Sequence, residues 1–77
     1  MSAMSKSQKV MMKDFHTKFF ALQEKYWNPD ETEDYWDHVT EDAMNLLTEF
    51  HSSDNSLNHF LSNLIADFLN SREEIVV

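Results

Sequence analysis

Apolar residues recur at alternating steps of three and four along the first third of the chain, at Met12, Phe15, Phe19, Leu22 and Tyr26. This spacing places the five side chains on one face of a helix. The lysines of the same segment lie away from that face. Ser5 or Ser7 can cap the helix at its start. We expect a first helix over residues 7–27, preceded by a frayed terminus.

A second series with the same spacing consists of Trp36, Val39, Ala43, Leu46 and Phe50. Pro29, the only proline, can end the first helix and take the first position of the second. Asn28 can then act as the cap, with Glu31 three residues beyond it. The pattern therefore predicts a second helix over residues 29–51.

The last third of the chain has the broadest apolar face, formed by Leu57, Phe60, Leu61, Leu64, Ile65, Phe68 and Leu69. It covers about half the circumference of a helix, whereas a surface helix needs a stripe only about 100° wide. A polar turn precedes it, with Ser53 or Asp54 as the cap. We expect a third helix over residues 54–72 with a frayed tail. It would lie between the other two helices or at a subunit interface.

These three segments predict one all-α domain, a compact antiparallel three-helix bundle. A chain of 77 residues buries only about 60% of its unfolded surface, yet 42% of this one is hydrophobic and 13% aromatic. Self-association as a homodimer is the expected outlet. Phe20 and Trp27 lie roughly 110–130° from the centre of the first apolar face. They either complete the packing of the bundle or form a second apolar surface for a partner.

Charge is distributed unevenly along the chain. The net charge is −8, and five of the six basic residues lie within the first 25 residues, in or directly before the first predicted helix. Asp30, Asp34, Asp37 and Glu41 should form a stripe on the second helix, partly compensated by the lysines of the first. The stripe either keeps the protein soluble or mimics a phosphate backbone and occupies a basic groove. Direct binding to nucleic acid or to anionic lipid is disfavoured.

Candidate chemistry is sparse. The chain has no cysteine and no glycine, which excludes sulfur-ligated zinc, Walker A loops and dinucleotide fingerprints. Asp34, His38 and Asp42 have a metal-like spacing, but a solvated acidic face is the preferred interpretation. Residues 30–41 resemble a calcium loop only superficially, because Tyr35 replaces the glycine at position six. We therefore expect no catalysis, metal or cofactor.

The start of the chain, residues 1–9, lacks the apolar core of a signal peptide, and no apolar run reaches the roughly 18 residues of a membrane span. We expect a cytoplasmic protein-protein interaction module, non-catalytic and homodimeric. Its partner would be a second copy, a basic protein surface, or both. The alternative is an acidic nucleic-acid mimic that inhibits a DNA- or RNA-binding protein, as in phages and mobile elements.

Overall fold

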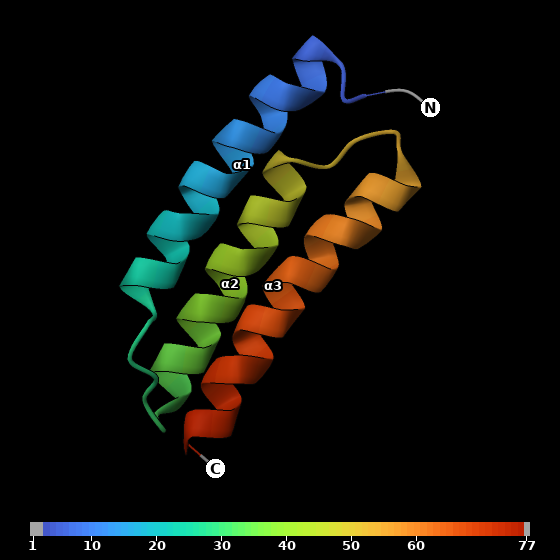
Figure 1. Cartoon of the computed structure of the whole chain (residues 1–77). Helices are drawn as coiled ribbons and strands as arrows, with labels where there is room; N and C mark the ends of the chain where they lie inside the picture. Colours follow the sequence, from blue (N-terminus) through green and yellow to red (C-terminus); the bar gives the residue numbers. More distant parts are fainter. Residues whose placement is uncertain (1–2, 77) are drawn as a thin grey trace.

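Three helices make up the computed structural model, which describes residues 3–76: α1 (Lys6–Lys25), α2 (Glu33–Glu49) and α3 (Asn55–Val76). The part of the chain that the structure describes contains no β-strand. In Figure 1 the chain runs down along α1, back up along α2 and down again along α3. The molecule measures 44 × 18 × 17 Å and is therefore elongated along its helices.

The apolar face predicted for the first helix is confirmed in full, because all five of its residues are buried. Phe15 is completely buried and meets Phe50 edge to face, with ring centroids 5.5 Å apart. Phe19 makes the same kind of contact with Phe68, at 6.1 Å. The core is completed by residues of α2 and α3: Val39, Ala43, Leu46, Leu61 and Ile65. Trp36, the first residue of the predicted second seam, is only partly buried against this core.

The start of α1 follows local sequence rules. Ser5 Oγ accepts a hydrogen bond from the backbone N–H of Gln8, and Gln8 Oε1 accepts one from the backbone N–H of Ser5. This reciprocal capping box satisfies two backbone donors that a helix end leaves free. Of the two caps considered, Ser5 is therefore correct.

The predicted start of the second helix is wrong. Residues 27–32 form a loop, and the cap of α2 is Thr32, whose hydroxyl accepts from the backbone N–H of Tyr35 at 3.4 Å. Asp30 accepts from the backbone N–H of Thr32, and the Tyr35 hydroxyl donates to the carbonyl of Tyr26 at 2.6 Å. These bonds hold Pro29 outside the helix. The helix also ends at Glu49, two residues earlier than predicted.

The turn between α2 and α3 is built without glycine, and no described residue has a positive φ. Ser52 and Asn58 exchange two hydrogen bonds between backbone and side chain, at 2.9 and 2.8 Å. Asp54 accepts from the backbone N–H groups of Ser56 and Leu57, which confirms it as the cap of the third helix. Short polar side chains thus satisfy the backbone groups at this turn.

Two expectations for the third helix are wrong. It does not fray after Arg72 but continues to Val76; Val77 lies outside the described residues. Of the two positions expected for it, the one between the other helices is wrong, because α2 packs against both α1 and α3; the position at a subunit interface stays a prediction. Phe60 is 49% exposed, and Leu57, Leu64 and Leu69 are half-buried. The wide apolar face of α3 is therefore only partly covered within one chain.

The corrected start of α2 can be tested with two caps. Thr32→Ala should lower the free energy of unfolding by about 1 kcal/mol, because the hydroxyl no longer satisfies the N–H of Tyr35. Asn28→Ala, in the loop, should change it by less than about 0.5 kcal/mol. Urea denaturation of both variants measures the two changes in the free energy of unfolding. A larger loss for Asn28→Ala would restore the earlier helix start.

The packing of α3 predicts unequal losses for two of its residues. Phe68→Ala should destabilise the protein by about 3–5 kcal/mol, because a buried ring is replaced by a cavity. Leu64→Ala should cost less than half as much, since Leu64 is half-buried. Chemical denaturation measures both values. Equal losses of unfolding free energy in the two variants would show that Leu64 is as deeply buried as Phe68.

Candidate interaction surface

Several large apolar side chains remain exposed among residues 3–76: Met4, Val10, Phe20, Trp27, Met44, Phe60 and Ile75. Phe20 is 61% exposed and Trp27 53% exposed. Phe20 lies on α1, and Trp27 lies in the loop two residues after the end of α1, seven positions after Phe20. Phe20 therefore does not complete the packing of the bundle, which was one of the two interpretations of its position.

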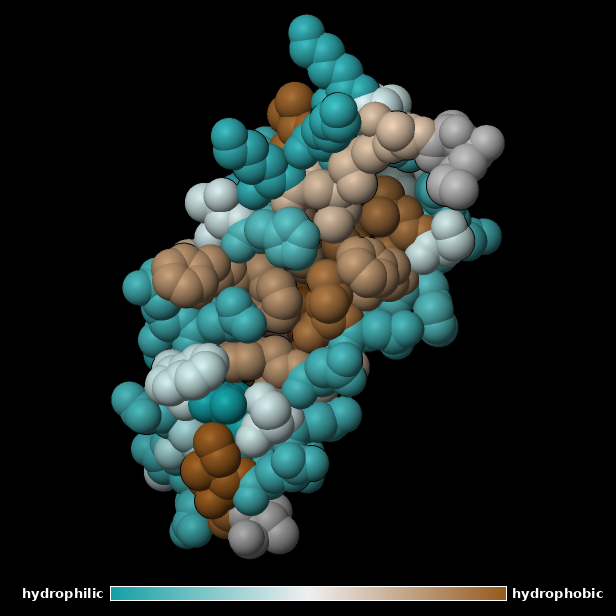
Figure 2. All heavy atoms as spheres, in the orientation of Figure 1, coloured by the Kyte–Doolittle hydropathy of each residue, from teal (hydrophilic) through white to brown (hydrophobic). Residues whose placement is uncertain are grey.

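The side of α1 next to Phe20, together with the loop residue Trp27, adjoins α3, because Phe19 and Trp27 both contact Phe68. Trp27 stacks on Phe68, with ring centroids 6.4 Å apart and planes inclined by 23°. Phe60 and Leu64 precede Phe68 by two turns and one turn, so they lie on the same side of α3. We call the surface formed by Phe20, Trp27, Phe60 and Leu64 the α1–α3 face. Figure 2 shows apolar atoms gathered along the middle of the visible face of the molecule.

A hollow lies where the beginnings of α1 and α3 meet, with a volume of about 380 Å³. Its apolar lining consists of Ala3, Met4, Met11, Met12, Leu57 and Phe60. Gln8, Asp54 and Ser56 supply its polar lining. Methionine side chains are flexible and polarizable, so such a lining adapts to an inserted aromatic or aliphatic group. Phe60 belongs both to this hollow and to the α1–α3 face, and it makes the two features continuous.

Arg72 lies at the end of the α1–α3 face that is far from the hollow. Its guanidinium lies 4.2 Å from the centroid of the Trp27 ring and donates to the Trp27 carbonyl at 2.7 Å. The residue is buried, and its Nε also donates to the hydroxyl of Ser71. A cation over an indole face is a favourable contact. Arg72 therefore fixes the Trp27 ring and the chain leaving α1.

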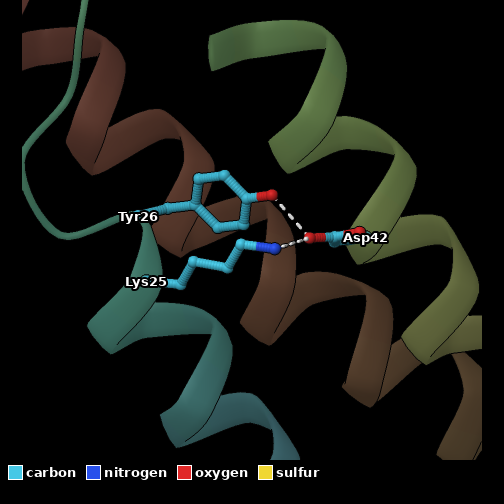
Figure 3. A network of polar contacts seen from close by, with 3 residues as sticks. All are labelled: Lys25, Tyr26 and Asp42. Atoms are coloured by element: carbon cyan, nitrogen blue, oxygen red, sulfur yellow. Dashed lines mark hydrogen bonds and ion pairs between the residues drawn. The ribbon is translucent and has the colours of Figure 1, made fainter.

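A polar network joins the end of α1 to α2 (Figure 3). The Tyr26 hydroxyl donates to Asp42 Oδ2 at 2.5 Å, and Lys25 Nζ donates to the same oxygen at 3.2 Å. The hydrogen bond from Tyr26 lowers the pKa of Asp42, and Lys25 acts in the same direction. Burial, followed by the bond to Asp42, raises the pKa of Tyr26. The network locks the relative position of the two helices.

The acidic residues proposed as one stripe are divided by the structure. Asp30 lies in the loop before α2 and binds the N–H of Thr32, so it does not belong to a helical stripe. Asp34, Asp37 and Glu41 are exposed on α2. The ion pairs formed within residues 3–76 use other acids: Lys18 pairs with Glu49, and Lys25 pairs with Asp42.

Lysines of α1 therefore do form ion pairs with acidic residues of α2. Their partners, Glu49 and Asp42, lie on the side of α2 next to α1. Within the described residues, no group of three histidine or acidic side chains is arranged to hold a metal ion. The carboxylate of Asp42 is instead bonded to Tyr26 and Lys25.

No helix in the described part of the chain combines the length and the apolar character that a membrane crossing needs.

The sequence alone identified Phe20 and Trp27 but not four further contributors to this surface, which are Phe60, Met4, Met11 and Arg72. Phe60 was assigned to the buried face of the third helix, although it lies near the edge of that face. Met4 and Met11 stand outside the seam spacing, and only the three-dimensional contact with α3 reveals them. Arg72 had a signal in the sequence, since it is the one basic residue after Lys25.

The Tyr26–Asp42 bond predicts a pH-dependent contribution to stability. Tyr26→Phe should lower the free energy of unfolding by about 1 kcal/mol near pH 7, the value for a partly exposed bond to a charged group. The folded pKa of Asp42 lies below its usual 3.8, so this stability is present above that pH and is lost as pH falls through the folded pKa.

The penalty of Tyr26→Phe should therefore be smaller at about pH 3 than at about pH 7. It should also shrink in an Asp42→Asn background, which provides the matched control. Urea denaturation at the two pH values measures both effects. A penalty independent of pH and of Asp42 would contradict this account.

Comparison with known proteins adds no family to these observations: no family model matches the chain, and neither a curated protein nor a solved structure does so.

Proposed function

We propose that this antiparallel three-helix bundle is a small acidic protein-protein interaction module that works as a cytoplasmic homodimer, without catalysis and without a cofactor. The observation that carries the proposal is the exposure of three aromatic residues, Phe20 on α1, Trp27 just after it and Phe60 on α3. Aromatic side chains and methionines are enriched in protein interfaces, and charged residues are depleted from their centres.

The distribution of polar groups supports a binding role over a catalytic one. One polar cluster, formed by Lys25, Tyr26 and Asp42, joins α1 to α2, and none of its residues lines the methionine-lined hollow. Arg72 is bonded to Trp27 and Ser71 within the same chain. These charge-assisted bonds thus connect segments of one chain to each other. What the surface offers to another molecule is mainly apolar area.

A second candidate is the acidic mimic, which is favoured by one observation. Asp34, Asp37 and Glu41 are exposed and take part in no ion pair within residues 3–76. Unpaired negative charges at helical spacing would attract a basic groove by the electrostatics that attract DNA to it. This candidate predicts a basic protein as partner and binding that weakens steeply with salt.

The homodimer is tested by light scattering coupled to size-exclusion chromatography. We expect a mass of twice the 9.1 kDa of one chain at high micromolar concentration. The melting temperature should rise with protein concentration, because association stabilises the folded state by mass action. Since apolar contacts are screened little by salt, the dimer should persist at high ionic strength. A mass of one chain, with a concentration-independent melt, would refute the homodimer.

A neutralised variant separates the two candidates. Asp34→Asn, Asp37→Asn and Glu41→Gln together remove three negative charges while keeping shape. As a solubilising face, the stripe should tolerate these changes, with a gain of a few tenths of a kcal/mol per relieved pair. As a phosphate mimic, it should lose its basic partner. A partner captured by wild type and lost by the variant, in salt-dependent fashion, would favour the mimic.

A further inference from the structure

We propose that a second copy of this chain covers the α1–α3 face through a twofold axis, so that Phe20 of each copy enters the methionine-lined hollow of the other. The inference rests on the proposed homodimer and adds the surface, the orientation and the anchoring residue. Three observations carry it: the charge of the helices, the features of the face, and its size.

Charge decides which side a second copy can approach. A chain of net charge −8 is repelled by a second copy of itself wherever acidic side chains meet. α2 carries six acidic residues and no basic one, so it is the least favourable side. α1 carries five lysines against two acids, and α3 carries three acids and Arg72. A dimer through the α1–α3 face therefore keeps both copies of α2 apart.

The face also contains both halves of a self-complementary contact. A twofold interface uses the same patch on both copies, so each copy must present the inserting group and its receptor. Phe20 is 61% exposed, and the hollow lined by Met11, Met12 and Phe60 lies two turns of α1 before it. Aromatic rings make favourable contacts with methionine sulfur, which suits a phenylalanine to this lining.

The size of the face fits a stable dimer. A bundle 44 Å long and 18 Å wide offers one long side on the scale of a standard interface, which covers about 800 Å² per partner. Trp27, 53% exposed near the far end of the same side, would be covered along with Phe20. One contact would thus remove the main aromatic exposure of the chain.

Symmetry then fixes where the axis passes. Phe20 follows Met12 by eight residues, which is about 12 Å along α1. If each Phe20 reaches the Met12 region of the other copy, the twofold axis must pass midway between these positions, at residue 16. His16 is exposed. The two copies of residue 16 should therefore face each other across the axis.

The absence of cysteine from the chain turns this into a direct test, because any disulfide between introduced thiols must join two copies. His16→Cys should cross-link to itself under mild oxidation, since a disulfide requires Cα atoms about 4.4–6.8 Å apart. Met44→Cys is the matched control: it is 58% exposed, but on α2. We expect cross-linking of His16→Cys at least about tenfold faster, with both variants shown to be folded by circular dichroism.

A second pair of variants tests the anchor by light scattering over a concentration series. Phe20→Asp should raise the dissociation constant of the dimer at least about tenfold, whereas Met44→Asp should leave it within about twofold. A dimer that survives Phe20→Asp, or that cross-links through Met44→Cys instead of His16→Cys, overturns this arrangement and leaves the homodimer standing. A monomeric wild type overturns both proposals.

Discussion

The pairing of a lysine-bearing helix with an acidic helix is the constraint on which the rest of the structure depends. α2 has six acidic residues and no basic one, so its favourable neighbour in this chain is the lysine-rich side of α1. Lys18 pairs with Glu49, and Lys25 and Tyr26 both bind Asp42. The buried seam of α1 sets the rotation of this helix about its axis, and these partly exposed contacts agree with that rotation. The side of α1 next to Phe20, together with the loop residue Trp27, is thereby turned away from α2 and toward α3.

The second constraint is the ratio of apolar material to chain length. The core is filled by one aromatic cluster, in which Phe15, Phe19, Phe50 and Phe68 meet edge to face or at an angle. A bundle of this size has no second interior to receive Phe20 and Phe60. Trp27 is partly covered, since Phe68 and the Arg72 guanidinium contact its ring. The remaining exposure, together with the methionine-lined hollow, gives the α1–α3 face its proposed binding role.

Periodicity predicted the three helices and the seam of α1, because a face that must be buried leaves a regular trace in the sequence. The loop before α2 could not be placed in this way. Asn28-Pro29 and Thr32 both satisfy the local rules for a helix start, and the choice is made by bonds from elsewhere. Tyr35 holds the Tyr26 carbonyl, and Arg72 reaches the Trp27 carbonyl across 45 residues of sequence.

The same limit applies to the candidate surface. The exposure of Phe20 and Trp27 could be anticipated from their angular position on the first helix as predicted over residues 7–27. The hollow could not, because it forms only where Met4 and Met11 meet Leu57 and Phe60 of α3. Asp30 was assigned to the stripe of α2 only because that helix was expected to begin too early. Errors in a helix boundary thus become errors in a site.

The central claim, that Phe20 of one copy fills the hollow of the other, is tested most directly by nuclear magnetic resonance on a mixed sample. One set of chains carries labelled methionine methyl groups, and the other carries labelled phenylalanine rings. The account predicts nuclear Overhauser contacts between copies, from the Phe20 ring to the methyl groups of Met11 or Met12. Contacts between copies that involve the Met44 methyl group on α2 instead, or none at all, would contradict it.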